Sequence, residues 1–336
     1  MSLHPVTSSR GAAKDAPRII DELLRRRVIV VLGKGGVGRT SIAAAIAHLA
    51  AAREMRTLVM ETDPRTPIAA AHERKSTFRP IELAPHLWSM LLDRQASLEE
   101  YLSFVVARPL LRAVFASPLY QYFVHAAPAV RELLMMGKIY HEIERRPATL
   151  PRWDLVIVDL PASGQALSML GMPFVARETF GNNLVGREAL EVARFFRDPA
   201  KCAMVVVTSV DQLALTETLE IDRRLAALQI ATAAVVFNRM ANAAFEEADV
   251  ASMLRQPGRS GAAGQFADLV AGLAAIARAE LQRRKRDRRA IGLLRRAIAA
   301  PIVELAEYSA ASGIALATRL AAQLDASTSA AARCGS

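Results

Sequence analysis

Eight residues near the N-terminus have the composition of a loop that holds phosphate groups. The segment GKGGVGRT runs from Gly33 to Thr40, after an apolar run and before an alanine-rich one. Glycines let successive backbone N–H groups turn toward an anion at a helix N-terminus, a basic residue balances the outer phosphates, and a hydroxyl can hold Mg2+. The sequence therefore predicts a site for a nucleoside triphosphate with Mg2+, with Thr40 as a metal ligand. The residues expected to bind are Gly33, Gly35, Gly36, Val37, Gly38, Arg39, Thr40 and Ser41.

Two basic residues distinguish this segment from a generic phosphate-binding loop. Lys34, directly after the first glycine, is an addition that the generic loop does not need. Arg39 stands before the hydroxyl residue, where lysine is usual. Arginine keeps the positive charge but is a planar fork instead of a compact ammonium group. We therefore predict nucleotide binding together with slow hydrolysis by this chain alone.

Two aspartates follow apolar runs and are candidates for the chemistry around the phosphates. Asp63 belongs to the segment ETDP, directly after TLVM, and Asp159 ends the run LVIVD. Phosphoryl transfer depends on positioning and on charge compensation, so it needs a carboxylate that orients the attacking water and accepts its proton. Asp63 is the candidate for that role. An ordinary Asp-Pro turn after a strand is the alternative for Asp63.

The loop GKGGVGRT resembles the deviant phosphate loop GKGGVGKT of a family of dimerising ATPases. That family includes the arsenite-pump ATPase, the tail-anchored-protein-targeting ATPase, the partition and septum-site ATPases and the nitrogenase iron protein. The resemblance implies ATP as the nucleotide and implies that Lys34 reaches across a dimer interface to the partner's nucleotide. ETDP is similar to the S-T-D-P segment in which the aspartate, here Asp63, orients water. The catalytic residues implied are thus Lys34, Asp63 and Arg39.

Two later segments extend the resemblance. DLPASGQAL resembles the family's switch D-x-x-P-T-G-H-x-L, which implies that Asp159 holds Mg2+ through water and that the Gly164 N–H faces the γ-phosphate. Gln165 stands in place of the family's histidine, so the coupling between the nucleotide and the helical region is in question. VVFNR resembles a strand end that sets an asparagine, here Asn238, against the adenine edge, and a turn-forming asparagine is the alternative. A weaker match retains Glu217, which is equally consistent with a helix surface.

Within this family the chain is most similar to the arsenite-pump and tail-anchored-targeting branch. A helical insertion, the ETDP segment and AVRELLMMGK favour that branch over the partition and septum-site branch. AVRELLMMGK resembles a helix that borders a client groove, so Met135, Met136 and the apolar stretch from Leu110 to Phe123 are expected to line either such a groove or ordinary core. A Cys-x-x-Cys zinc clamp, metalloid cysteines and a shared iron–sulfur cluster all need more than Cys202 and Cys334. No zinc and no arsenite site are therefore expected.

The composition is that of a soluble enzyme with one large domain. The chain has 336 residues, of which 52% are hydrophobic and 23% charged. Its net charge of +10 comes from arginines scattered over helical patterns, so nucleic acid is not an expected partner and membrane contact should be at most peripheral. No apolar run approaches the roughly 18 residues of a membrane span, and the N-terminus lacks a signal-peptide core. With only two cysteines, a cytoplasmic location is expected.

Short β-branched runs alternate with longer alanine- and leucine-rich patterns, the order typical of βαβ units. This predicts an α/β fold, a P-loop NTPase with a mainly parallel sheet flanked by helices, plus a helical insertion subdomain at about 94–148. Strands are expected at 28–32, 57–61, 87–92, 154–159, 203–208, 233–238 and 301–305, and one or two long basic helices at 265–299. Residues 18–325 should form a single ATPase domain between disordered tails at 1–17 and 326–336.

The leading hypothesis is an ATPase that cycles between ATP-closed and ADP-open dimers and handles a hydrophobic protein client. An alternative of another class is a catalytically weakened, nucleotide-binding subunit of a heterodimer with a paralogous ATPase, which Arg39 and Gln165 favour. A third is a partition-like ATPase that binds DNA or membrane through a basic or C-terminal helix. The residues do not decide between a homodimer and a heterodimer.

Overall fold

The computed structural model describes residues 18–105, 128–144, 153–241, 245–254, 262–308 and 311–327. Its centre is one eight-stranded sheet with the order β3-β4-β2-β5-β1-β6-β7-β8. The strands are β1 (Val28–Gly33), β2 (Thr57–Glu61), β3 (Ile81–Ala84), β4 (Leu87–Leu91), β5 (Leu155–Asp159), β6 (Cys202–Thr208), β7 (Thr232–Met240) and β8 (Ile302–Ala306). Neighbouring strands pair in parallel, except for the antiparallel pair β3 and β4. The expected α/β fold is confirmed.

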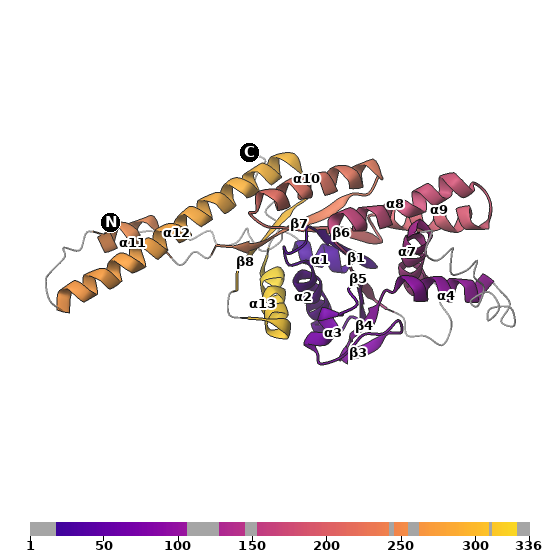
Figure 1. Cartoon of the computed structure of the whole chain (residues 1–336), viewed down its shortest axis with the longest axis horizontal. Coiled ribbons are helices and arrows are strands. Elements are labelled where there is room, and N and C mark those ends of the chain that lie inside the picture. The colour runs from indigo at the N-terminus through magenta and orange to yellow at the C-terminus, as the bar shows by residue number, and fades with distance from the viewer. Residues whose placement is uncertain are drawn as a thin grey trace, which may run out of the picture.

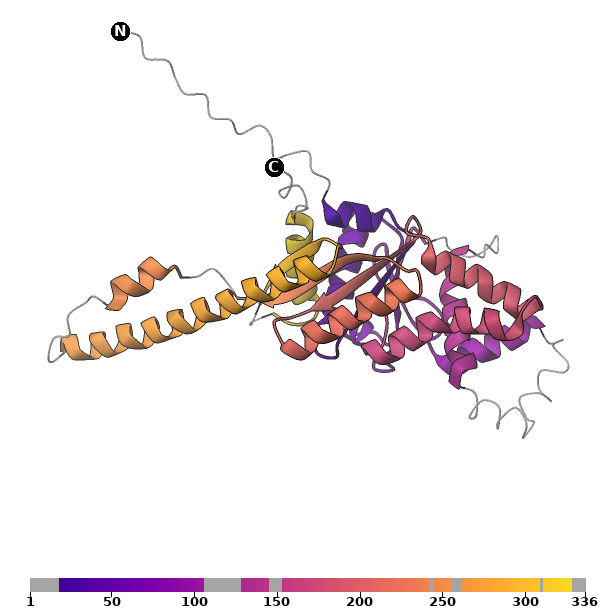
Figure 2. The ribbon, with the colours of Figure 1, turned by 90° about the horizontal axis from the view of Figure 1, so that it is seen from above.

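Helices cover both faces of the sheet (Figures 1 and 2). They are α1 (Ile19–Leu24), α2 (Arg39–Ala52), α3 (Pro67–Ala71), α4 (Arg94–Val105), α7 (Pro128–Glu144), α8 (Ser163–Phe180), α9 (Leu184–Arg197), α10 (Gln212–Ala227), α11 (Glu247–Leu254), α12 (Ala262–Ala297) and α13 (Gly313–Ala326). Successive strand residues point to opposite faces, so Ile29 and Val31 pack in the core with α1, α2 and α13, whereas Val30 and Leu32 pack in the core with α7, α8 and α9. This double burial explains the continuous apolar strand sequences.

The seven strands expected from the sequence are all present, and β3 is the one that the pattern missed. β3 reads IELA, and all four of its residues are partly or fully exposed. It pairs only with β4 at the edge of the sheet. A short edge strand of this kind lacks the continuous apolar run by which the buried parallel strands are detected.

The helical insertion is represented by α4 and α7, which lie within the range 94–148. Residues 106–127 and 145–148 of that range, and with them the apolar stretch 110–123, lie outside the described residues, as do 1–17 and 328–336. Met135 and Met136 are buried at 2% and 0% exposure, so they belong to the core and do not line an open groove. α13 extends to Ala326, one residue beyond the expected end of the domain. The domain boundaries stay a prediction.

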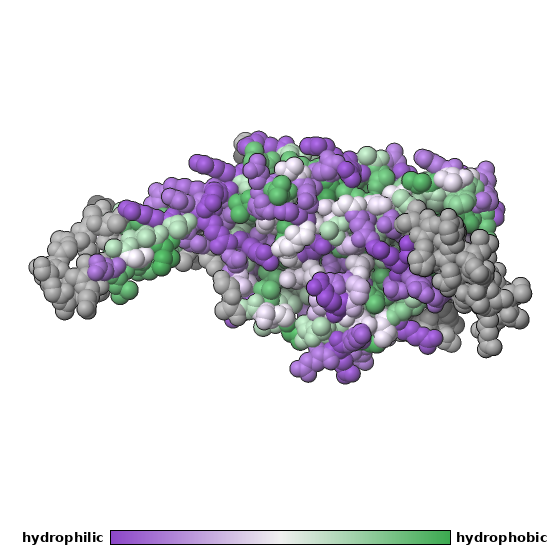
Figure 3. Space-filling view, viewed as in Figure 1, coloured by the Kyte–Doolittle hydropathy of each residue, from purple (hydrophilic) through white to green (hydrophobic). Residues whose placement is uncertain are grey.

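The long basic segment near the C-terminus forms one helix, α12, and not two. Its N-terminal part and α11 project from the body on the side opposite α4 and α9 (Figures 1 and 2), whereas its C-terminal part packs against β7. Leu269, Leu273 and Ile276 are exposed on the projecting part, which carries an apolar patch on its surface (Figure 3). None of the described helices is both long and apolar enough to cross a membrane.

The parallel strands bring the candidate site together. In the register, Asp159 of β5 is paired with Val31 of β1 and with Glu61 of β2. Gly33 at the end of β1 is paired with Val207 of β6. Because parallel strands end at one edge of the sheet, the segments that follow β1, β2, β5, β6 and β7 all begin at that edge, where open α/β sheets bind ligands.

Candidate nucleotide-binding site

The predicted phosphate loop connects β1 to α2 in a conformation that depends on its glycines. Gly33, Gly36 and Gly38 have φ angles of +145°, +88° and +96°, a region that residues with a Cβ rarely adopt. Helix α2 begins at Arg39, and its N-cap residue Gly38 has no side chain that could accept a hydrogen bond from the first turn. The N–H groups of that turn are therefore available to an anion.

Asn238 at the end of β7 holds this loop through a hydrogen bond. Its amide nitrogen donates a 2.9 Å hydrogen bond to the carbonyl oxygen of Val37, and the residue is 4% exposed at the end of β7. A Cβ placed on Gly38 would lie 2.5 Å from the same amide nitrogen, so both sterics and backbone angle require glycine there. The contact of Asn238 with adenine stays a prediction. In the structure, the amide nitrogen of Asn238 donates to the Val37 carbonyl oxygen in the loop.

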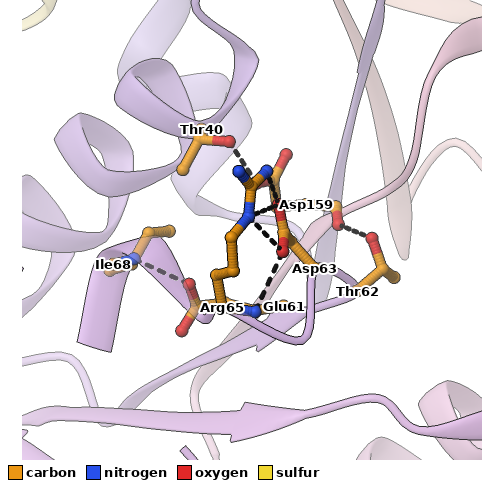
Figure 4. A network of polar contacts seen from close by, with 7 residues as sticks. All are labelled: Thr40, Glu61, Thr62, Asp63, Arg65, Ile68 and Asp159. Carbon is orange, nitrogen blue, oxygen red and sulfur yellow. Dashed lines mark hydrogen bonds and ion pairs between the residues drawn. The ribbon is translucent and has the colours of Figure 1, made fainter. Parts of the chain in front are cut away.

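Thr40 and Asp159 face each other at the start of α2 and the end of β5 (Figure 4). The Thr40 hydroxyl donates a 2.6 Å hydrogen bond to Oδ2 of Asp159. Asp159 is 6% exposed, and its Oδ1 has no hydrogen-bond partner within the described parts of the chain. Burial raises the pKa of this carboxyl above its ordinary value, although the Thr40 hydroxyl and the Arg39 guanidinium oppose that shift. A buried carboxylate oxygen that lacks a donor, next to a hydroxyl, fits a hydrated Mg2+ ion.

The Arg39 side chain, which the sequence predicts to bind phosphate, contacts two backbone carbonyl oxygens instead. Its Nη1 donates to the carbonyl oxygen of Leu160 at 2.5 Å and to that of Pro161. Burial lowers the pKa of the guanidinium from its ordinary value, against the opposing effects of the Asp159 and Glu217 carboxylates. The side chain remains a cation, because arginine does not deprotonate at physiological pH. In this conformation, Arg39 stabilises the backbone that follows Asp159, and a phosphate group would compete with two carbonyl oxygens for it.

Asp63 is paired with Arg65 in the same loop (Figure 4). Oδ2 of Asp63 accepts a 2.6 Å hydrogen bond from Nη2 of Arg65, and Oδ1 accepts one from the Arg65 backbone N–H at 2.9 Å. The hydrogen bonds from the Arg65 side chain and backbone hold the pKa of Asp63 below its ordinary value. The Arg65 side chain is 87% exposed, so this pair contributes little to stability and can open readily.

Lys34 is held by its own chain. Its Nζ donates a 2.7 Å hydrogen bond to Oδ2 of Asp211, with side-chain exposures of 23% and 52%. The other carboxylate oxygen of Asp211 accepts a hydrogen bond from the Leu213 N–H and so caps α10. The hydrogen bond from Lys34 is the largest cause that lowers the pKa of Asp211. An exposed pair of this kind can exchange for another acceptor at small cost.

The predicted switch segment starts α8. Ser163 is the first residue of that helix, and its hydroxyl donates a 2.7 Å hydrogen bond to Oε2 of Glu217 on α10. A Cβ on Gly164 would meet no atom within 4 Å, so the first turn of α8 borders open space. Ser41 lies in the first turn of α2 and lines a small cavity beside α3 and α13. The family resemblance includes Glu217 without deciding its role. In the structure, Glu217 accepts a hydrogen bond from Ser163 of the predicted switch segment.

Glu61 is a site residue that the sequence interpretation overlooked. Its buried carboxylate accepts hydrogen bonds from the backbone N–H groups of Ile68 and Ala69, at 2.7 and 3.2 Å, and from the Ser89 hydroxyl at 2.7 Å. Burial raises the pKa of this carboxyl, although those hydrogen bonds oppose the shift. Glu61 thus fixes the first turn of α3 and with it the loop that carries Asp63 (Figure 4). A glutamate as the last residue of a buried strand was the available signal.

Comparisons with known proteins agree with this geometry. Residues 26–190 match the model of the family described as anion-transporting ATPase. The ATPase BagA of Mycobacterium tuberculosis is 27% identical over 256 residues, which is 73% of each chain. The ATPase ASNA1 homolog of Plasmodium falciparum is 26% identical over 165 residues, 48% of this chain and 41% of its own. An uncharacterized protein of Streptomyces coelicolor is 30% identical over 149 residues, 44% and 37% of the two chains.

Proposed function

We propose that this chain is an ATPase of the anion-transporting ATPase family, whose model matches residues 26–190, and that it binds ATP with Mg2+ and hydrolyses it slowly when alone. The observation that carries the proposal is the pair formed by Thr40 and the buried Asp159, next to a helix N-terminus whose N–H groups have no side-chain cap. An unpartnered buried carboxylate oxygen is costly unless a cation or water compensates it. The cytoplasmic location expected from the sequence is part of this proposal.

The roles of the residues follow from their positions. The N–H groups from Gly35 to Thr40 bind the phosphates, since they lie at the N-terminus of α2, which has no side-chain cap. Thr40 contributes its hydroxyl to Mg2+, and Asp159 orients the water of that ion. Mg2+, when bound, neutralises the charge that develops on the phosphate oxygens. Asp63 leaves Arg65, turns toward the γ-phosphate and accepts the proton of the attacking water.

The test of this site is Thr40→Ala. We expect the Mg2+-dependent part of ATP binding to weaken by about tenfold or more, because a ligand of the ion is removed, while ATP binding without Mg2+ stays the same. Affinity is measured by titration calorimetry with and without Mg2+. Thr40→Ser keeps the hydroxyl and is the matched control, so it should bind like the wild type. Equal Mg-ATP affinity in Thr40→Ala and the wild type would contradict the site.

A dimer is the second part of the proposal. Lys34 precedes the glycines that surround the nucleotide of its own chain. In the proposed dimer its ammonium group leaves Asp211 and binds a phosphate of the partner subunit's nucleotide. The exposed pair with Asp211 costs little to break. The partner is a second copy of this chain or a paralogue, and the position of Arg39 on two carbonyl oxygens favours a paralogue with a more mobile lysine in that place.

Lys34→Ala should abolish ATP-dependent association while most of the nucleotide affinity remains. The molar mass is measured by light scattering with ADP and with non-hydrolysable ATP, alone and with the paralogue. The matched control is Asp211→Asn, which removes the partner of Lys34 within the chain but keeps an acceptor for the α10 cap, so it should still associate. A protein that stays monomeric throughout, with affinity lost in Lys34→Ala, would exclude a role across an interface.

An apolar client is supported by a cavity of about 350 Å3 between α4, α7 and α9. Its walls are mainly apolar and include Leu98, Leu134, Val185 and Val192. Phe180 at the rim is 41% exposed. Such a surface suits a hydrophobic segment of another protein. Helices α7 and α9 both pack against α8, which begins at the predicted switch segment after Asp159.

A further inference from the structure

Two histidines that are far apart in sequence meet beside the phosphate loop. His48 lies on α2, about two turns after Ser41, and His72 directly follows α3. Their Nε2 atoms are 3.3 Å apart, and the ring planes differ by 11°. Both rings line a cavity of about 180 Å3 whose other walls come from α13, Thr40 and Ser41. No role in nucleotide binding explains this pair.

The distance between the nitrogens discriminates between two explanations. A well-formed N–H hydrogen bond spans roughly 2.7 to 3.2 Å, so 3.3 Å is long for a bond between two neutral imidazoles. Two nitrogen ligands on a tetrahedral metal with bonds of about 2.0 to 2.1 Å are separated by about 3.3 to 3.4 Å. The observed separation equals that of two nitrogen ligands of one tetrahedral ion and is at the long end for a hydrogen bond.

The electrostatic surroundings favour the metal-binding form of both rings. Burial lowers the pKa of His48 and of His72 below the ordinary value, and for His48 the neighbouring His72 adds to the shift. Neutral imidazole is the form that ligates metals. Within the described residues, no group of three or more histidine, cysteine or acidic side chains is placed to hold a metal ion, so water would fill the remaining positions beside the two histidines. The cavity has room for several water molecules.

We propose that His48 and His72 form a binding site for a divalent transition-metal ion of the zinc type, completed by water in the adjoining cavity. Imidazole nitrogen selects Zn2+, Ni2+ or Cu2+ over Mg2+, which prefers oxygen. The site therefore differs in its ligands from the Mg2+ position, where Thr40 and Asp159 offer oxygen atoms. The expectation of no zinc was based on the absence of cysteine patterns. It did not consider two histidines that are far apart in sequence and that the fold brings together.

Such an ion would join α2 to α3. Helix α3 is anchored at its first turn by Glu61, and the Thr66 N–H at its start donates to the carbonyl oxygen of Asp63. A metal at His72 therefore restrains the loop that must move when Asp63 leaves Arg65. This consequence rests on the proposed ATPase function: Zn2+ should slow ATP turnover by holding that loop in place.

The test uses the full-length protein without a histidine tag and with Cys334→Ser, so that neither adds a ligand. Zn2+ binding is measured by calorimetry without nucleotide for the parent, His48→Gln and His72→Gln. His86→Asn is the matched control, because His86 lies in the turn between β3 and β4 with φ +62°, a conformation that asparagine tolerates. Cu2+ replaces Zn2+ for electron paramagnetic resonance, in which nitrogen couplings count the bound imidazoles.

We expect a single Zn2+ site in the parent and in His86→Asn, and affinity lower by at least about tenfold in each of the two site variants. Zn2+ should raise the Tm of the parent and of the control only. The Cu2+ spectrum should lose one imidazole nitrogen in each site variant. Equal Zn2+ affinity in all four proteins would overturn the site. If Zn2+ binds as expected but no variant or parent hydrolyses ATP, the ATPase proposal fails and the metal site stands.

Discussion

Replacing Asp63 by asparagine should reduce the rate of ATP hydrolysis by about 100-fold or more while ATP affinity and Tm stay close to those of the wild type. A general base contributes on the order of 10² to 10⁴ to the rate, and asparagine cannot accept the proton of the attacking water. Asparagine still offers an oxygen to the Arg65 N–H, which Oδ1 of Asp63 accepts at 2.9 Å. The loop should therefore keep its shape, and the loss should appear in kcat.

Arg65→Ala is the matched control for this experiment. It removes the guanidinium that holds the pKa of Asp63 low and competes for its carboxylate. The pKa of Asp63 should then rise toward its ordinary value, so the acid limb of the rate profile should move to higher pH. Turnover at neutral pH should be equal to or above that of the wild type, because the carboxylate stays ionised there. If Asp63→Asn retained most of the wild-type turnover, the assignment of Asp63 as the base would be wrong.

Replacing Arg39 by lysine should raise turnover by roughly tenfold or more. A charge that compensates the transferring phosphoryl group must be positioned closely, and one such group is typically worth 10² to 10³ in rate. The Arg39 guanidinium donates to the carbonyl oxygens of Leu160 and Pro161. Both hydrogen bonds come from one guanidinium nitrogen, Nη1, whereas lysine carries a compact ammonium group on a flexible stem. It is therefore more available to the phosphates.

The Arg39→Lys experiment also separates the two forms of the proposal. ATP turnover is measured for the wild type and the variant, each alone and with the paralogue. Arg39→Gln is the control, since it removes the charge and should lower both binding and turnover. If the wild type is as fast as Arg39→Lys, the weakened-subunit form fails. If neither protein hydrolyses ATP without the paralogue, the simple homodimeric form fails.

The residues themselves determined the fold class and the glycine-dependent turn of the predicted phosphate loop. Buried parallel strands must be apolar on both faces, so runs such as those of β1, β5 and β6 are visible without a structure. A loop with glycines at positive φ angles also needs those glycines in a fixed local order, and Gly36 and Gly38 have such angles. The burial of a strand and the backbone angles of a loop both depend on residues that are close together in the chain. Such local patterns can be recognised in the sequence alone.

Contacts between distant segments were decided only by the tertiary structure. The side chain of Arg39 could have turned toward phosphates or carbonyl oxygens, and the packing of β5 beside α2 presents the carbonyls of Leu160 and Pro161. Glu61 became the anchor of α3, and His48 met His72, because α2 and α3 pack on the same side of the sheet. Hydrogen bonds and metal ligands depend on distances of a few ångströms, and separation along the chain carries no such information until the helices have packed.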